Sequence, residues 1–198
     1  MIGSRFAEGE PRYELWEAIR RRAFPGSVSN HHLGTLLGLL MATYEMNHFR
    51  DTYQPAVLAN AKAFARALHA CGLDVAGDPA VGYTETHQVI VRVGYGRGPE
   101  LARRLEASNL ICNYQATPEE EGFTASGALR LGVSEMTRFG LTAEDFGTVA
   151  AWLAVVVRDG AEVRAEVAAF RRRFQELRYC FQGEQYEGVL AQLHDRLR

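Results

Sequence analysis

The hydrophobic pattern changes character at Gly72, and this change limits the possible folds more than any other feature. Before Gly72, apolar residues recur at helical spacing over residues 11–22, 33–46 and 53–71, with Pro55 in the first turn of the third stretch. After it, short strand-like runs occupy residues 73–75, 88–93, 110–112 and 128–133. The pattern predicts an α+β fold in which helices cover one face of a small, mostly antiparallel sheet.

Turn and capping residues divide the rest of the chain. A Pro-, Gly-, Ser- and Asn-rich segment at residues 23–32 predicts a loop, and residues 114–123 predict a polar loop. Pro99 opens another helix, Thr142 is placed to cap a further one, and residues 161–173 and 186–197 form a helical tail.

Composition excludes several classes of function. The chain has 198 residues and a net charge of -2, which gives no electrostatic reason to bind nucleic acid or an acidic membrane. The apolar run at residues 33–42 is too short to span a bilayer and follows no basic segment, so we expect neither a membrane anchor nor a signal peptide. Three widely separated cysteines favour a reduced, cytoplasmic protein.

Few motifs for metal or phosphate chemistry are present. His31 and His32 are adjacent and cannot both bind one metal at helical ligand spacing, so no metal site is expected. The GYGRG segment from Gly94 follows a strand but lacks the spacing of a phosphate-binding loop. Cys71 and Cys112 lie in apolar surroundings typical of packing cysteines, although sequence distance leaves a Cys–His nucleophilic pair open.

Arg130 is the most informative charged residue. It stands between Leu129 and Leu131 in TASGALRLG, residues 124–132, a segment otherwise made of small and apolar side chains. A guanidinium held there needs an anion, because an unpaired buried charge costs several kcal/mol. Both an internal acidic residue and the carboxylate of a bound ligand would meet that need.

The basic residues are also informative. Of the 22, 21 are arginine, and the single lysine is Lys62. A mechanism that requires a lysine must therefore use Lys62 or a lysine on another chain. Lys62 falls on the polar side of its predicted helix, which favours a solvated surface residue.

Five stretches are informative in combination. They are Met1-Ile2, AFPG from Ala23, YQ..V..NAKA from Tyr53, the strand at His87, and SGALRLG followed by MTRFGLTAEDF to Phe146. In this order and at this spacing they resemble the C-terminal part of serine hydroxymethyltransferase and its relatives, the fold-type I pyridoxal-phosphate enzymes. The resemblance implies interface helices at residues 1–50, a small C-terminal domain at 51–160 and a helical tail at 161–198.

The resemblance also implies roles for particular residues. Arg130 takes the position of the arginine that binds the α-carboxylate of the amino-acid substrate, and pyridoxal 5'-phosphate is the implied cofactor. Ser29, Asn30 and His32 take the position of a loop that reaches the cofactor phosphate across the dimer. The aldimine-forming lysine is expected upstream of residue 1, so no catalytic residue is assigned in this chain, which should be inactive without a lysine-bearing partner domain or chain.

Departures from the pattern bear on the reaction. Val28 to His31 stand where hydroxymethyltransferases have Gln-Gly-Gly-Pro, and Cys112 to Gln115 depart from the segment that carries the folate-binding asparagine. GYTETHQV from Gly82 and RLGVSEMTRFG from Arg130 look closer to the threonine transaldolases, which use no folate. We therefore expect a portion of an L-threonine transaldolase. The alternatives are a portion of a folate-dependent hydroxymethyltransferase and a non-catalytic dimerisation domain.

Overall fold

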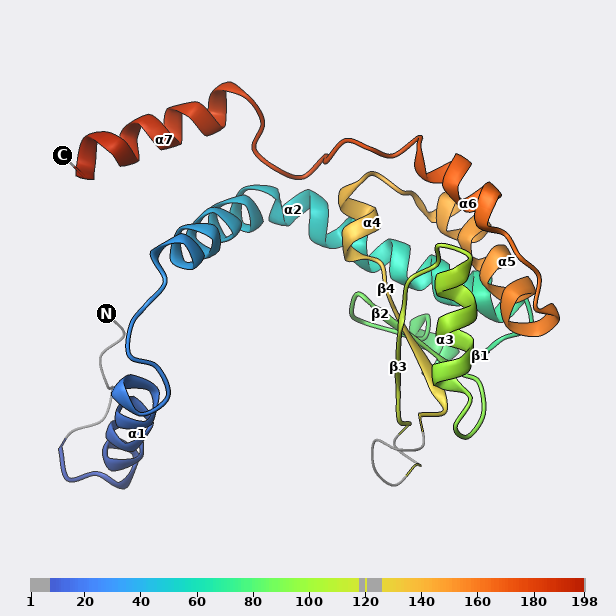
Figure 1. Cartoon of the computed structure of the whole chain (residues 1–198), viewed down its shortest axis with the longest axis horizontal. Coiled ribbons are helices and arrows are strands. Elements are labelled where there is room, and N and C mark those ends of the chain that lie inside the picture. Colours follow the sequence, from blue (N-terminus) through green and yellow to red (C-terminus); the bar gives the residue numbers. More distant parts are fainter. Residues whose placement is uncertain (1–7, 118–119, 121–125, 198) are drawn as a thin grey trace. The chain divides into compact units, whose positions relative to one another are not determined.

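The computed structural model describes residues 8–117, 120 and 126–197. Met1-Ile2, the beginning of the TASGALRLG segment and two of the three consecutive glutamates at 119–121 lie outside these residues. The chain divides into two compact units, Met1–Met46 and Asn47–Arg198 (Figure 1), and each is described by itself. The division expected from the sequence at residues 50 and 160 stays a prediction.

The first unit is helical. Helix α1, Pro11–Arg21, begins at a proline that lacks only an N–H which the first turn leaves unbonded, as predicted. A single wide turn, η1, Arg22–Ser27, then occupies part of the segment predicted to be a loop. The Val28 N–H donates to the Ala23 carbonyl at 3.1 Å and closes this turn. Phe24 inside it is extended, at φ -138° and ψ 126°, so the backbone of the predicted loop is not a continuous helix.

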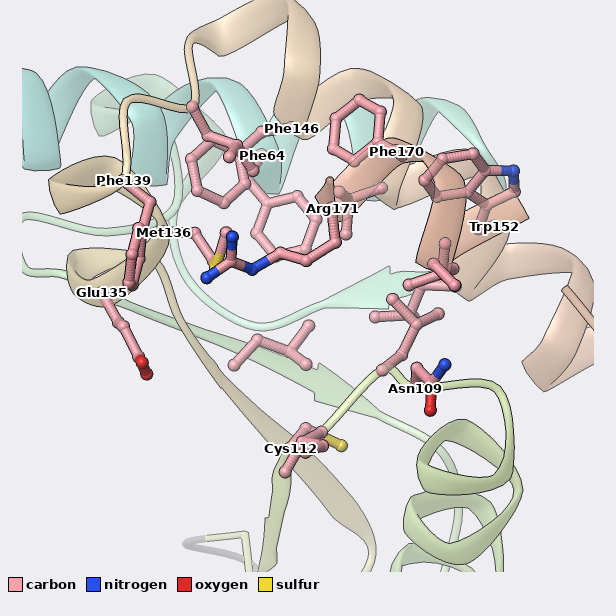
Figure 2. A pocket seen from close by; sticks show the side chains of 18 of the residues that line it. Phe64, Asn109, Cys112, Glu135, Met136, Phe139, Phe146, Trp152, Phe170 and Arg171 are labelled. Carbon is pink, nitrogen blue, oxygen red and sulfur yellow. The ribbon is translucent and has the colours of Figure 1, made fainter. Parts of the chain in front are cut away.

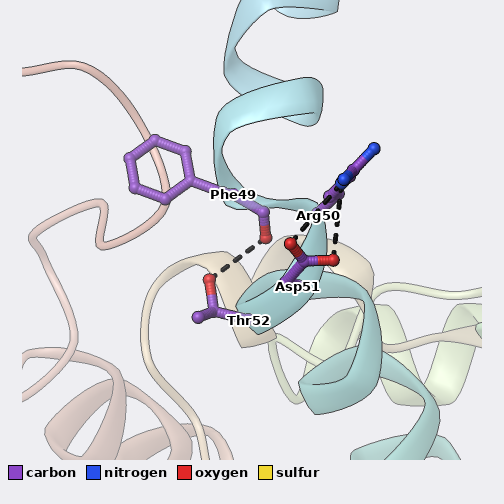
Figure 3. Close-up of polar contacts among 4 residues, drawn as sticks. All are labelled: Phe49, Arg50, Asp51 and Thr52. Carbon is purple, nitrogen blue, oxygen red and sulfur yellow. Dashed lines mark hydrogen bonds and ion pairs between the residues drawn. The ribbon is translucent and has the colours of Figure 1, made fainter.

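Helix α2, Leu33–Ala70, is 38 residues long and corrects the prediction of two separate helices. Pro55 lies inside it, at a position where proline removes one hydrogen bond of the helix. Tertiary packing compensates, because Tyr53 and Val57 on either side of Pro55 are buried. In the turn of α2 before Pro55, the Thr52 hydroxyl donates to the Phe49 carbonyl at 3.1 Å (Figure 3).

The second unit contains a four-stranded antiparallel sheet of order β1-β2-β4-β3. The strands are β1, Asp74–Val75, β2, Gln88–Arg92, β3, Asn113–Gln115, and β4, Ala128–Gly132. Val89 pairs with Leu131 and Val91 with Leu129, and all four side chains are buried. Since neighbouring residues of a strand point to opposite faces, Arg130 lies on the other face. The predicted α+β fold is confirmed.

The remaining helices of the second unit follow in chain order. They are α3, Gly98–Ala107, α4, Ser134–Arg138, α5, Ala143–Asp159, α6, Arg164–Arg171, and α7, Glu184–Leu197, with a short helix η2, Pro79–Val81, after β1. All but the two shortest, α4 and η2, match predicted helices. Thr142 begins α5 as expected, and its N–H and hydroxyl both donate to the Asp145 carboxylate, at 2.9 and 2.8 Å.

The strand predicted at residues 110–112 is wrong by three positions. Asn109 adopts a positive φ of 62° and closes α3, and the Leu110 N–H donates to the Leu105 carbonyl at 2.8 Å. That closure uses residues 109–110 for the helix end, so pairing with β4 begins only at Asn113. Ile111, between the two elements, is 85% exposed.

Candidate functional site

Arg130 lies at the centre of β4, with a cross-strand neighbour on each side. Ile90 of β2 and Asn113 of β3 pair with it, so the three side chains share one face of the sheet. Arg130 is half-buried, and its guanidinium forms no hydrogen bond or ion pair with any other described residue. Of the two partners considered from the sequence, an internal acid is therefore not found in the described part of the chain.

The backbone that leads into β4 is held on both sides. The Ser126 carbonyl accepts from the Gly98 N–H and the Gly127 carbonyl accepts from the Val93 N–H, each at 2.8 Å. A side chain at Gly98 would place its Cβ 2.5 Å from the Ser126 carbonyl oxygen, so only glycine fits there. The Glu120 carboxylate adds two bonds, accepting from the backbone N–H groups of Thr117 and Gly127 at 2.7 and 3.0 Å.

The backbone that leaves β4 is fixed by helix α2. The buried Asn60 amide donates to the Thr137 hydroxyl at 3.0 Å and to the Leu141 carbonyl at 2.9 Å. The Tyr53 hydroxyl donates to the Ser134 carbonyl at 2.9 Å, and burial raises the pKa of this phenol. The NAKA and MTRFGL stretches, separate in the sequence, are thus joined directly. These contacts hold the position of Arg130 from the C-terminal side.

Ser29, Asn30 and His32 lie in the first unit, between η1 and the start of α2. All three are exposed, and their side chains form no hydrogen bond or ion pair with the rest of the described chain. The His32 carbonyl accepts from the Leu36 N–H at 3.1 Å, so the segment enters directly into the first turn of α2. Arg130 belongs to the second unit, and the two groups are described separately.

Lys62 has a structural contact that the sequence did not indicate. Its ammonium donates to the Val81 carbonyl at 2.8 Å, and its methylene groups pack close to Gly82. The side chain is half-buried. The prediction of a solvated surface lysine is therefore corrected: Lys62 connects α2 to the last residue of η2 through a backbone carbonyl.

A cavity of about 900 Å³ lies on another side of the second unit (Figure 2). Its walls come from α2, β4, α4, α5, α6 and the segments between α3 and β3 and after α6. Apolar side chains predominate, and five of them are aromatic. Sequence reasoning missed it, because the aromatic residues are distributed over four helices and each fits an ordinary core position in its own periodicity.

Cys112 borders this cavity, and burial raises the pKa of its thiol to about 11. Since an exposed cysteine titrates near 9, the folded chain should hold roughly 100-fold less Cys112 thiolate at pH 8. We expect iodoacetamide to alkylate Cys112 about 100-fold more slowly in the folded chain than in urea, as followed by peptide mass spectrometry. Equal rates in the two states would contradict the burial of this thiol.

No helix among the described residues combines the length and apolar character needed to cross a bilayer. No group of three or more His, Cys, Asp or Glu side chains is arranged to hold a metal ion in this part of the chain.

The serine hydroxymethyltransferase family model matches residues 5–153. The chain belongs to this family. The serine hydroxymethyltransferase of Staphylothermus marinus is 40% identical over 172 residues, which cover 84% of this chain and 39% of that protein. The enzyme of Archaeoglobus fulgidus is 38% identical over 176 residues, which cover 86% of this chain and 40% of that protein. The chain thus spans about 40% of the length of these curated relatives.

A solved structure gives the same result for the fold. The crystal structure of L-threonine transaldolase from Pseudomonas fluorescens, in its internal aldimine state, matches with a TM-score of 0.80 and 30% identity, over 94% of this chain and 43% of that one. The resemblance read from the sequence, to the C-terminal part of a serine hydroxymethyltransferase-like enzyme, is confirmed. Membership of this family implies dependence on pyridoxal phosphate.

Proposed function

We propose that this chain supplies the C-terminal part of a pyridoxal-phosphate-dependent aldol-type enzyme that acts on β-hydroxy-α-amino acids. The observation that carries the proposal is the half-buried guanidinium of Arg130, which has no acidic partner among the described residues. A single carboxylate that binds through both oxygens satisfies such a group in charge and in geometry. The α-carboxylate of an amino acid is that ligand.

Arg130 then acts by orientation. Its strand is hydrogen-bonded on both sides, so the guanidinium approaches the substrate from a fixed backbone position. Ile90 and Asn113, its two cross-strand neighbours, border the carboxylate on the same face of the sheet. The planar guanidinium of Arg130 binds both carboxylate oxygens and so prevents rotation of the substrate, which a lysine ammonium cannot do.

Ser29, Asn30 and His32 are the residues proposed to hold the cofactor's phosphate. They offer a hydroxyl, an amide and an imidazole, all exposed and without partners in the described chain, directly before the N-terminus of α2. This set of donors fits an anion. When bound, pyridoxal phosphate supplies an electron sink for the carbanion at the substrate's α-carbon. The lysine that binds the cofactor comes from the remaining part of the protein, on the same or another chain.

The reaction we favour is that of an L-threonine transaldolase. The β-hydroxyl of threonine loses its proton as the Cα–Cβ bond breaks, the electron pair stays on Cα, and acetaldehyde leaves. Cα then adds to the carbonyl carbon of a second aldehyde, whose oxygen takes up a proton. The TM-score of 0.80 over 94% of the chain supports it. The alternative reaction, folate-dependent transfer of the serine hydroxymethyl group, is supported by the higher identity, 40% against 30%, to a hydroxymethyltransferase.

A second, non-catalytic function is favoured by the beginning of α2. Leu33, Leu36, Leu37, Leu39 and Leu40 are all exposed, with Leu33 at 65%. So many exposed leucines on one helix indicate a surface that is buried in an interface, since large exposed apolar patches mark interaction sites. The partner in this interface is a second copy of the chain, as in a dimerisation domain, or the lysine-bearing part.

One reconstitution experiment separates these functions. The chain is produced together with the lysine-bearing part, whether the two are encoded as one protein or as two. We expect the visible absorbance of the lysine-bound cofactor and release of acetaldehyde that requires threonine but no tetrahydrofolate. Turnover of serine that requires tetrahydrofolate would instead establish the hydroxymethyltransferase. A stable complex that is inert with both substrates would refute the catalytic proposal and favour the interaction domain.

A further inference from the structure

The cavity of the second unit is built for a ligand with an aromatic body. Five aromatic side chains line it: Phe64, Phe139, Phe146, Trp152 and Phe170 (Figure 2). They come from α2, α5, α6 and the end of α4, so rings face the cavity from several directions. Its volume of about 900 Å³ lies within the range of small-molecule sites, roughly 300–1,000 Å³. Rings on several sides favour an aromatic guest through edge-to-face contacts.

A positive charge lies among these rings. The Arg171 guanidinium carbon is 4.2 Å from the centre of the Phe139 ring, and Figure 2 shows the side chain extending from α6 into the cavity. One of its N–H groups donates to the Phe174 carbonyl. Arg171 is half-buried and forms no ion pair within the described chain, although Glu135 also borders the cavity. Arg172 also borders the cavity, but its side chain is exposed. A mainly apolar cavity that holds the half-buried Arg171 cation is complementary to an apolar ligand with one anionic group.

We propose that this cavity binds a small aromatic carboxylate, with its rings among the five aromatic side chains and its carboxylate on Arg171. The site is separate from the one proposed for the amino acid, because Leu131, which lines the cavity, points to the opposite face of β4 from Arg130. The proposal does not depend on the catalytic function. An occupant would contact α4, α6 and β4 together, and thus the strand that carries Arg130.

The test uses 2-naphthoate and its uncharged amide, 2-naphthamide, with the full chain in isothermal titration calorimetry. We expect the wild-type chain to bind 2-naphthoate at least tenfold more tightly than 2-naphthamide, because only the carboxylate pairs with the guanidinium. Arg171→Gln should weaken 2-naphthoate at least tenfold and change 2-naphthamide less than threefold. Arg164→Gln, an exposed arginine on the same helix that does not line the cavity, should change neither affinity.

A second variant tests the position of the site. Ala168 lines the cavity, and Ala168→Phe fills part of it, so both probes should lose at least tenfold in affinity. Circular dichroism and thermal unfolding establish that each variant is folded. Equal affinities of the wild-type chain for the two probes would overturn the proposal without any variant. Naphthoate binding that is unchanged in both Arg171→Gln and Ala168→Phe would overturn it as well.

Discussion

Arg130→Lys should lower kcat/KM of the reconstituted enzyme for its amino-acid substrate by roughly 10- to 150-fold, which corresponds to the loss of one charge-assisted hydrogen bond. Lysine keeps the charge but cannot bind both carboxylate oxygens in one plane. Because the Arg130 guanidinium forms no hydrogen bond or ion pair with any other described residue, the substitution should leave the free energy of unfolding nearly unchanged. Steady-state kinetics with threonine and urea unfolding measure the two quantities.

The control for this variant is Arg103→Lys, an exposed arginine on α3. It should reproduce wild-type kinetics, since it lies on a helix outside the sheet face that carries Arg130. If Arg130→Lys also retains wild-type kcat/KM, the carboxylate role of Arg130 is refuted. Loss of activity accompanied by an equal loss of stability would instead indicate a structural arginine.

Asn60→Leu should reduce the free energy of unfolding by about 2–4 kcal/mol. The substitution removes both hydrogen bonds of the buried amide and leaves the Leu141 carbonyl and the Thr137 hydroxyl without their donor. Each buried polar group left unsatisfied costs about 1–3 kcal/mol. The apolar area that leucine adds offsets part of this cost. Urea unfolding monitored by circular dichroism gives the value.

Gln54→Leu on the same helix provides the matched control, because Gln54 is exposed. Its effect should stay within about 0.5 kcal/mol, as is usual for surface positions. A loss below 0.5 kcal/mol for Asn60→Leu would mean that α2 and the segment after β4 are not joined as the structure describes.

Local patterns were sufficient to predict the elements whose periodicity extends over many residues. The alternation in β2 and β4 and the capping residues of α5 determine those elements almost alone. The importance of Arg130 could also be predicted from the sequence, because a charge between two leucines in a strand is unusual in any fold. The sequence left its partner open, and the structure removes only the internal acid within the described residues.

Features that depend on contacts between residues far apart in the sequence could not be predicted from the sequence. Helix α2 continues through Pro55 because buried residues on both sides of the proline pack against other elements, and nothing local reports that packing. The partner of Lys62, the Val81 carbonyl, lies 19 residues away in the sequence and belongs to the short helix η2. The cavity around Arg171 requires four helices to be placed at once.

The two outer strands of the sheet are its shortest, with two residues in β1 and three in β3, whereas the inner strands have five. Unpaired backbone groups along an outer strand are templates for another molecule's strand, and shortening that strand limits such growth. Because Asn109 ends α3 before residues 110–112 can extend β3, Leu110, Ile111 and Cys112 are kept off this edge. The early start predicted for that strand would have given the protein an apolar, aggregation-prone border.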